Sequence, residues 1–136
     1  MLQLAFISTF GLSVTEKDIT DILDRSRKNN RTDEITGILI ADGMRFLQVL
    51  EGDRKKVQAT FARIGVDKRH FAIFKLIDRE APDRDFGEWD MAYRQVQNAT
   101  DEDDLVKQAG LMTSKLQDGI VRHKLRHFLH FDRQAL

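Results

Sequence analysis

Two strand-like segments separated by an Asp-Gly dipeptide are the feature that most constrains the fold of this chain. Residues 35–40 are largely β-branched and apolar, and residues 45–51 form a second apolar segment. Asp42-Gly43 lies between them and is a typical hairpin turn sequence, because both residues tolerate the positive φ angles that tight hairpin turns need. The sequence therefore predicts an antiparallel hairpin.

One strand and one helix are predicted before this hairpin. Residues 2–8 form a strand that is apolar on both faces, which is typical of a covered, central strand. Thr15, with Asp18 three residues later, is a helix start signal. We expect this helix to end near Asn29-Asn30, because Asn tolerates the left-handed backbone that ends helices.

A second helix and two more strands are predicted after the hairpin. Asp53 is the expected cap of the helix, and the strands cover residues 71–77, with Ala72, Phe74 and Leu76 alternating, and 91–96. A polar loop is expected at 78–85. The order β-α-β-β-α-β, with one strand more, predicts an α+β, ferredoxin-like fold in which two helices cover one face of a sheet.

The character of the sequence changes near residue 97. We predict a core domain over 1–97 and a helical extension over 98–136, with helices at 105–112 and 116–131. Val121, Leu125 and Phe128 form an apolar stripe, which is the expected surface for a protein partner or for self-association.

Composition excludes several classes of function. The chain has no cysteine, and its 22 basic and 22 acidic residues balance, which gives no electrostatic case for nucleic acid binding. No apolar segment is long enough to span a membrane, and no signal peptide pattern is present. We expect a cytoplasmic protein.

Three places could carry chemistry. Gln48 lies between Phe46 and Leu50 on one face of its predicted strand, where a buried amide needs hydrogen-bond partners. It either bonds to a backbone group or a buried water, or faces a bound polar ligand. Asn29-Asn30 either ends a helix or offers an amide to a heterocycle edge. Arg69-His70 is either a solvated pair or holds a phosphate or ribityl chain.

Taken together, these positions resemble a known family. The motifs that carry the resemblance are Ser26-Arg27-Lys28-Asn29-Asn30, Ile35-Thr36-Gly37-Ile38-Leu39, Phe46-Leu47-Gln48-Val49-Leu50-Glu51-Gly52, Asp67-Lys68-Arg69-His70, Phe86 and Trp89-Asp90-Met91. In this order and spacing they resemble the BLUF family of flavin-binding blue-light sensors. The resemblance covers about residues 2–97, and the C-terminal helices are similar to the variable helical cap of short family members.

The resemblance implies a flavin site between the two helices and the sheet. It implies that Asn30 binds the pyrimidine edge of the flavin, that Asn29 is a secondary contact, and that Gln48 lies beside the ring. It also implies the following placements: Ile22 and Ile64 on the ring faces, Arg69 and His70 toward the ribityl-phosphate tail, and Trp89 and Met91 in the segment that reports on Gln48. The expected cofactor is FAD, with FMN or riboflavin as alternatives.

Phe6 departs from the family pattern. It occupies the position of the photoactive tyrosine, and a phenyl ring has no hydroxyl to orient Gln48 and no acidic proton to give. We therefore expect that the flavin pocket is retained and that the usual light response is weak or absent. A natural member that has lost its response and a deliberate tyrosine-to-phenylalanine variant both account for Phe6. The chain's single tyrosine, Tyr93, is not assumed to substitute.

Other functions are weighed against this prediction. The alternative is a light-insensitive module of the same fold that binds another small ligand or only protein. No catalytic triad, carboxylate pair or phosphate loop is visible, so we do not expect an enzyme. His123, His127 and His130 share a helical face, but we predict no metal site, because no cysteine accompanies them and basic residues surround them. We expect a protein effector and a homo-oligomer.

Overall fold

The order of strands and helices in the computed structural model follows the predicted plan. The structure describes residues 1–10, 14–41, 45–87, 89, 91–95, 110 and 123. Its elements are β1 (Leu2–Phe10), α1 (Glu16–Asp33), β2 (Thr36–Ala41), β3 (Arg45–Gly52), α2 (Arg54–Gly65), β4 (His70–Glu80) and β5 (Ala92–Gln95).

Several predicted features lie outside the described residues. These are the Asp42-Gly43 turn, the two C-terminal helices with their stripe of Val121, Leu125 and Phe128, and the histidines His127 and His130. Of the predicted extension, only Gly110 and His123 are described, and both are helical. Within the described part of the chain, no helix is long and apolar enough to cross a membrane.

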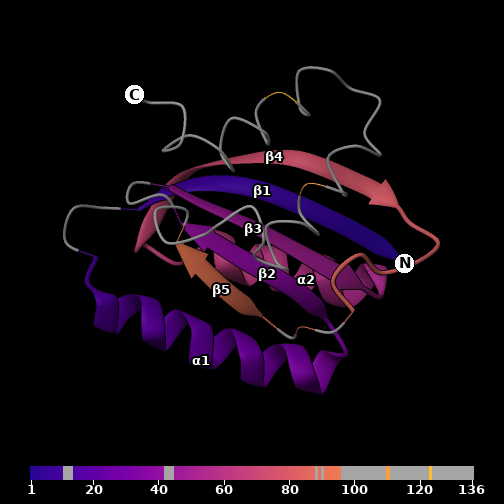
Figure 1. The fold of residues 1–136 in the computed structure, drawn as a ribbon, viewed down its shortest axis with the longest axis horizontal. Coiled ribbons are helices and arrows are strands. Elements are labelled where there is room, and N and C mark those ends of the chain that lie inside the picture. The colour runs from indigo at the N-terminus through magenta and orange to yellow at the C-terminus, as the bar shows by residue number, and fades with distance from the viewer. Residues whose placement is uncertain are drawn as a thin grey trace.

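The strands form one sheet in the order β4-β1-β3-β2-β5 (Figure 1). β1 lies between β3 and β4 and is antiparallel to both, while β2 is antiparallel to β3 and parallel to β5. The predicted hairpin pairing of β2 with β3 and the predicted fifth strand are therefore both present. The ferredoxin-like prediction is confirmed.

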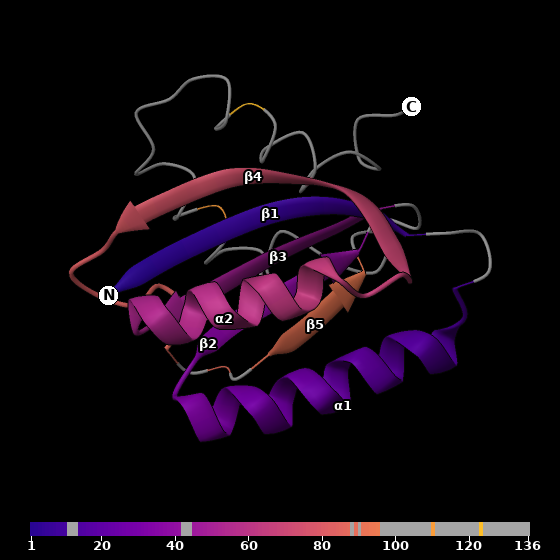
Figure 2. The same cartoon turned by 180° about the vertical axis from the view of Figure 1, so that it is seen from behind.

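The two faces of the sheet carry separate apolar clusters. Both helices cover one face, which we call the helix face (Figure 2); its cluster contains Leu2, Leu4, Phe6, Leu23, Phe46, Leu50 and Val57. The other, which we call the opposite face, carries Ala5, Ile38, Ile40, Leu47, Val49, Leu76, Ile77 and Phe86. This division follows from strand geometry, since successive side chains point to opposite faces.

Helix α1 begins where predicted but ends later. Thr15 and Asp18 form the predicted capping box, in which the Asp18 N–H donates to Thr15 Oγ1 at 3.2 Å and the Thr15 N–H donates to Asp18 Oδ2 at 2.9 Å. The prediction that the helix ends near Asn29-Asn30 is wrong. The helix runs to Asp33 and is ended by Glu34 in the left-handed conformation, with φ of 55°. Asn30 stays helical and is buried beside the sheet.

Strand β4 is longer and less regular than predicted. It extends to Glu80, so the polar loop expected at 78–85 begins only at Ala81, because Asp78 and Glu80 pair with β1 despite their polarity. Two register shifts interrupt the pairing, and Ala72 has a positive φ of 52°. The simple alternation expected for this strand is therefore wrong: Phe74 is 55% exposed, whereas Leu76 is buried.

Candidate functional site

A cavity of about 570 Å³ lies between α1, α2 and the helix face of the sheet. This volume is in the range of small-molecule sites. The cavity is lined by Asp21, Ile22, Arg25, Ser26, Asn29 and Asn30 of α1, Thr60, Arg63 and Ile64 of α2, Leu39, Phe46 and Gln48 of the sheet, and Val66, Asp67, Arg69 and His70. All seven residues predicted to contact a cofactor are in this set.

Gln48 is a buried amide in the sheet wall of the cavity. Its side chain is 6% exposed, and the polar contact that the structure records for it is from Nε2 to Met91 Sδ at 4.0 Å. A thioether sulfur is a weak acceptor, and this contact leaves the amide oxygen of Gln48 without a recorded partner among the described residues. Buried amides in proteins are normally hydrogen-bonded, so Gln48 has hydrogen-bonding capacity available for a ligand or a water in the cavity.

The α1 wall combines amides with an apolar side chain. Asn30 is only 1% exposed, and Asn29 and Ile22 line the same cavity. Ile22 and Asn30 are eight residues apart in one continuous helix, so they lie on the same side of it. The continuation of α1 past Asn30 therefore holds these side chains on a rigid element.

The α2 wall supplies Ile64, which lies across the cavity from α1. Thr60, also on α2, is buried and lines the same space. Apolar side chains on two facing helices, with amides at one edge, match a flat heterocycle that has apolar faces and one polar rim. The arrangement fits the isoalloxazine ring of a flavin, whose pyrimidine edge carries hydrogen-bond donors and acceptors.

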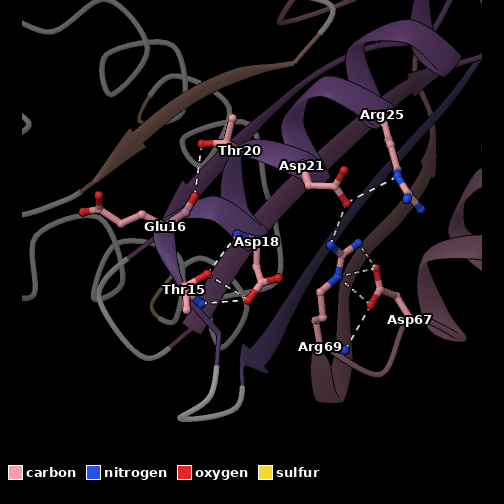
Figure 3. Close-up of polar contacts among 8 residues, drawn as sticks. All are labelled: Thr15, Glu16, Asp18, Thr20, Asp21, Arg25, Asp67 and Arg69. Atoms are coloured by element: carbon pink, nitrogen blue, oxygen red, sulfur yellow. Dashed lines mark hydrogen bonds and ion pairs between the residues drawn. The ribbon is translucent and has the colours of Figure 1, made fainter.

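Four charged residues of the cavity lining, Asp21, Arg25, Asp67 and Arg69, pair with one another (Figure 3). Arg69 donates to Asp67 at 2.6 Å and to Asp21 at 2.9 Å, and Asp21 also pairs with Arg25 at 3.3 Å. The hydrogen bond from Arg69 holds the pKa of Asp67 below its usual range, and desolvation only partly opposes this. The guanidinium of Arg69 is therefore already matched by two carboxylates.

His70 is also fully engaged within the protein. Its Nδ1 lies 2.9 Å from Ser8 Oγ, and its Nε2 lies 2.7 Å from the carbonyl oxygen of Ile64. A role for Arg69 and His70 at a ribityl-phosphate tail remains a prediction, and in this structure the polar atoms of both are bonded to other residues. Arg63 also lines the cavity, and its recorded partner among the described residues is only the neutral hydroxyl of Thr60 at 3.3 Å.

Phe6 lies beside the cavity rather than in its wall. It is fully buried, pairs with Gln48 across the β1–β3 ladder, and has its ring 4.9 Å from that of Phe61. Phe6 and Gln48 are directly opposite each other on the helix face, so their side chains are neighbours. The sequence prediction that these two positions belong together agrees with this pairing.

Trp89 and Met91 lie on different faces of the sheet. Met91 is 1% exposed, belongs to the helix-face cluster and contacts Gln48. Trp89 packs on the opposite face, with its ring 6.2 Å from that of Phe86. Both were predicted to report on Gln48, and only Met91 contacts it. Tyr93 packs on the helix face and pairs with Leu39, which separates it from Gln48 by one strand.

Sequence reasoning missed several lining residues. Arg63 was not identified, although its position one residue before Ile64 placed it at the same helix end. Ser26 lies one turn before Asn30 on α1 and was recognised only as part of a motif. Asp67 was recognised only as part of a motif, two residues before Arg69. Asp21 carries no sequence signal of its own, because only the fold brings it to Arg69.

The fold and the cavity define a small-molecule-binding domain, and comparison with known proteins specifies its family. The family model described as "BLUF: Sensors of blue-light using FAD" matches residues 1–92. The chain therefore belongs to the BLUF family, and FAD is the cofactor that this family uses. The resemblance inferred from the motifs is confirmed.

Individual relatives agree with this assignment. The blue light- and temperature-regulated antirepressor BluF of Escherichia coli K12 is 35% identical over 71 residues, which are 52% of this chain and 18% of that protein. The solved dark-state structure of the BLUF protein BlrB is 27% identical, covers 91% of this chain and 92% of its own, and has a TM-score of 0.72. A bacterial light-regulated adenylyl cyclase is 28% identical, covers 96% of this chain and 40% of its own, and has a TM-score of 0.71.

Proposed function

We propose that this chain is a blue-light-sensing domain that binds FAD in the α1–α2 cavity and whose tyrosine-dependent response is weak or absent. The observation that carries the binding site is Gln48, a buried amide in the cavity wall whose recorded polar partner among the described residues is a thioether sulfur. When bound, FAD supplies the absorption of blue light. The protein orients the ring and controls the groups around it.

The residues of the cavity have distinct roles in this proposal. Asn30 and Gln48 hydrogen-bond to the polar edge of the ring, with Asn29 as a secondary contact. Ile22 and Ile64 pack on its two faces and exclude water. FMN and riboflavin carry the same ring and use the same contacts, so the tail decides between them.

We assign the phosphate tail to the cavity mouth. Arg63 is the cation best suited to a phosphate there, because Arg69 is held by Asp21 and Asp67. Arg69 and His70 then shape the mouth of the site and order the segment between α2 and β4.

In this proposal, the phenyl ring of Phe6 is what weakens the tyrosine-dependent light response. A phenol at this position would reach the neighbouring Gln48 amide as a hydrogen-bond donor, whereas the phenyl ring of Phe6 offers no proton. The buried, apolar setting of Phe6 against Phe61 leaves Gln48 without this partner.

Signalling is proposed to pass through protein contacts rather than through catalysis by this domain. Residues 1–92 match the model of a sensor family, and the light-regulated adenylyl cyclase has more than half of its chain outside the part that is similar to this protein. An unidentified protein effector, a homo-oligomer formed through the 98–136 extension, and a cytoplasmic location complete the proposal.

FAD titration of the parent and of a matched pair of variants tests the site. We expect Gln48→Leu to weaken FAD binding by about tenfold, the equivalent of about 1.4 kcal/mol for one lost hydrogen bond. Gln58→Leu makes the same change on the exposed side of α2 and should leave the affinity unchanged. A parent that binds no flavin would favour a light-insensitive module of the same fold, whereas equal FAD affinities for all three proteins would refute the contact between Gln48 and the ring.

A further inference from the structure

The segment from Asp85 to Met91 is the part of the chain that brings Met91 to Gln48. It is the later part of the connection between β4 and β5, and β5 is an edge strand of four residues that pairs only with β2 among the described strands. Such a short edge strand is held weakly by its own ladder. The position of Met91 must therefore depend on contacts made by other parts of the molecule.

A buried carboxylate holds the start of this segment. Glu51 is fully buried on β3, three residues after Gln48. Its Oε2 accepts the N–H of Asp85 at 2.7 Å, and its Oε1 accepts the N–H of Phe86 at 2.8 Å. Hydrogen bonds from N–H groups to a carboxylate are among the stronger ones in proteins.

The same carboxylate is saturated by side chains from two other strands. Gln3 on β1 donates to Oε2 at 2.8 Å, and Thr36 on β2 donates to Oε1 at 3.3 Å. Each oxygen of Glu51 therefore accepts two hydrogen bonds. Arg79 of β4 donates to Gln3 Oε1 at 2.7 Å, so the network ties four strands of the sheet to the segment.

The guanidinium of Arg27, on α1, holds the Met91 end of the 85–91 segment. Arg27 Nε donates to the carbonyl oxygen of Met91 at 3.0 Å. Arg27 lies three residues before Asn30, on the helix that forms one wall of the cavity. Between these two ends, the N–H of Gly37 donates to the carbonyl oxygen of Trp89 at 2.8 Å.

We propose that Glu51 and Arg27 are positioning residues that hold Met91 against Gln48 and so set the orientation of the buried amide. Neither residue lines the cavity, and both act through the backbone of the 85–91 segment. The consequence of this orientation for flavin rests on the proposed function, whereas the anchoring itself does not.

Two substitutions remove one anchor each. Glu51→Gln keeps the shape but replaces one oxygen by an NH2 group, which cannot accept a hydrogen bond, so one pair of donors loses its partner. Arg27→Met keeps the apolar stem of the side chain and removes the donor. Arg27→Lys retains a donor and should restore part of the parent behaviour.

FAD-free protein gives the decisive measurements. We expect amide exchange at Asp85 or Phe86 to rise about tenfold or more in Glu51→Gln, because a charge-assisted bond is lost. In both Glu51→Gln and Arg27→Met, the side-chain NH2 resonance of Gln48 should move, and the emission of Trp89, the only tryptophan of the chain, should shift to longer wavelength.

A matched control separates positioning from general destabilisation. Val57→Ala removes buried methyl groups from α2, which contributes none of the recorded hydrogen bonds to the described residues of the 85–91 segment, and should lower the unfolding midpoint without moving the Gln48 resonance or the Trp89 emission. An unchanged Gln48 resonance in both anchor variants would overturn the proposal, even if the protein binds flavin. Loss of flavin binding by the parent would overturn the proposed function and leave these readouts intact.

Discussion

Substituting Phe6 by tyrosine tests the central inference about the photochemical centre. The Phe6 side chain is fully buried, so the added hydroxyl cannot reach water. A buried hydroxyl without a partner costs about 1–3 kcal/mol, whereas a hydroxyl that bonds to Gln48 recovers about 1 kcal/mol. We therefore expect Phe6→Tyr to lower the free energy of unfolding by no more than about 2 kcal/mol.

A double-mutant cycle isolates the contact. Gln48→Leu removes the amide, so Phe6→Tyr in that background leaves its hydroxyl unpaired and should cost about 1–3 kcal/mol. Urea unfolding of the parent, both single variants and the double variant gives the coupling energy, which we expect to be at least 1 kcal/mol, roughly, and favourable. A coupling energy below about 0.5 kcal/mol would refute the placement of Phe6 against Gln48.

The same variant has an optical readout. Absorption spectra of the FAD-bound parent and of FAD-bound Phe6→Tyr are recorded before and after blue light. We expect a reversible red shift in Phe6→Tyr that is weak or absent in the parent. A parent that shifts reversibly and fully would contradict the weak response that we attribute to Phe6, and no shift in either protein would mean that the pocket has diverged elsewhere.

Two further predictions concern stability. Gly37→Ala would place a Cβ 2.0 Å from the backbone oxygen of Val49, so we expect the free energy of unfolding to fall by about 3 kcal/mol. In the control Gly65→Ala the nearest atom to the new Cβ lies at 4.0 Å, so this substitution should be neutral or stabilising by up to about 1 kcal/mol. Equal effects of the two substitutions would refute the close approach of β2 and β3. Asp67 has a lowered pKa in the folded state, so its ion pair with Arg69 stabilises the fold above the ordinary aspartate pKa of about 4 and is lost as pH falls through the lower, folded-state value. Asp67→Asn should therefore be less stable than the parent at pH 7, with a gap in unfolding free energy that closes below about pH 4. Asp83→Asn, in the exposed loop, serves as control, and a gap that does not depend on pH would show that the ion pair is not its cause.

The amino-acid sequence by itself determined the order of the elements and much of the site. The period-two pattern in β3 placed Phe46, Gln48 and Leu50 on one face, and the caps Thr15 and Asp53 marked the starts of both helices. These signals are local, because side-chain alternation and cap hydrogen bonds involve residues close in the chain. The seven predicted cofactor contacts line one cavity, and they were identified from the order of motifs along the chain.

Tertiary structure decided where local preference was overruled. Asn29 and Asn30 favour a helix end, yet α1 continues past them because Asn30 is buried beside the sheet. Asp78 and Glu80 favour a loop, yet they pair with β1. Long-range contacts supply the free energy that local propensity lacks.

The polar partners of the site were also decided by the fold alone. No sequence pattern joins Arg69 to Asp21, or Glu51 to the N–H groups of Asp85 and Phe86, because these groups are separated by more than thirty residues. Folding brings them together, and a buried or half-buried charge then requires the partners it meets there. The motif order thus predicted residues that line one cavity, and the tertiary structure determined which charged groups of that cavity are already paired.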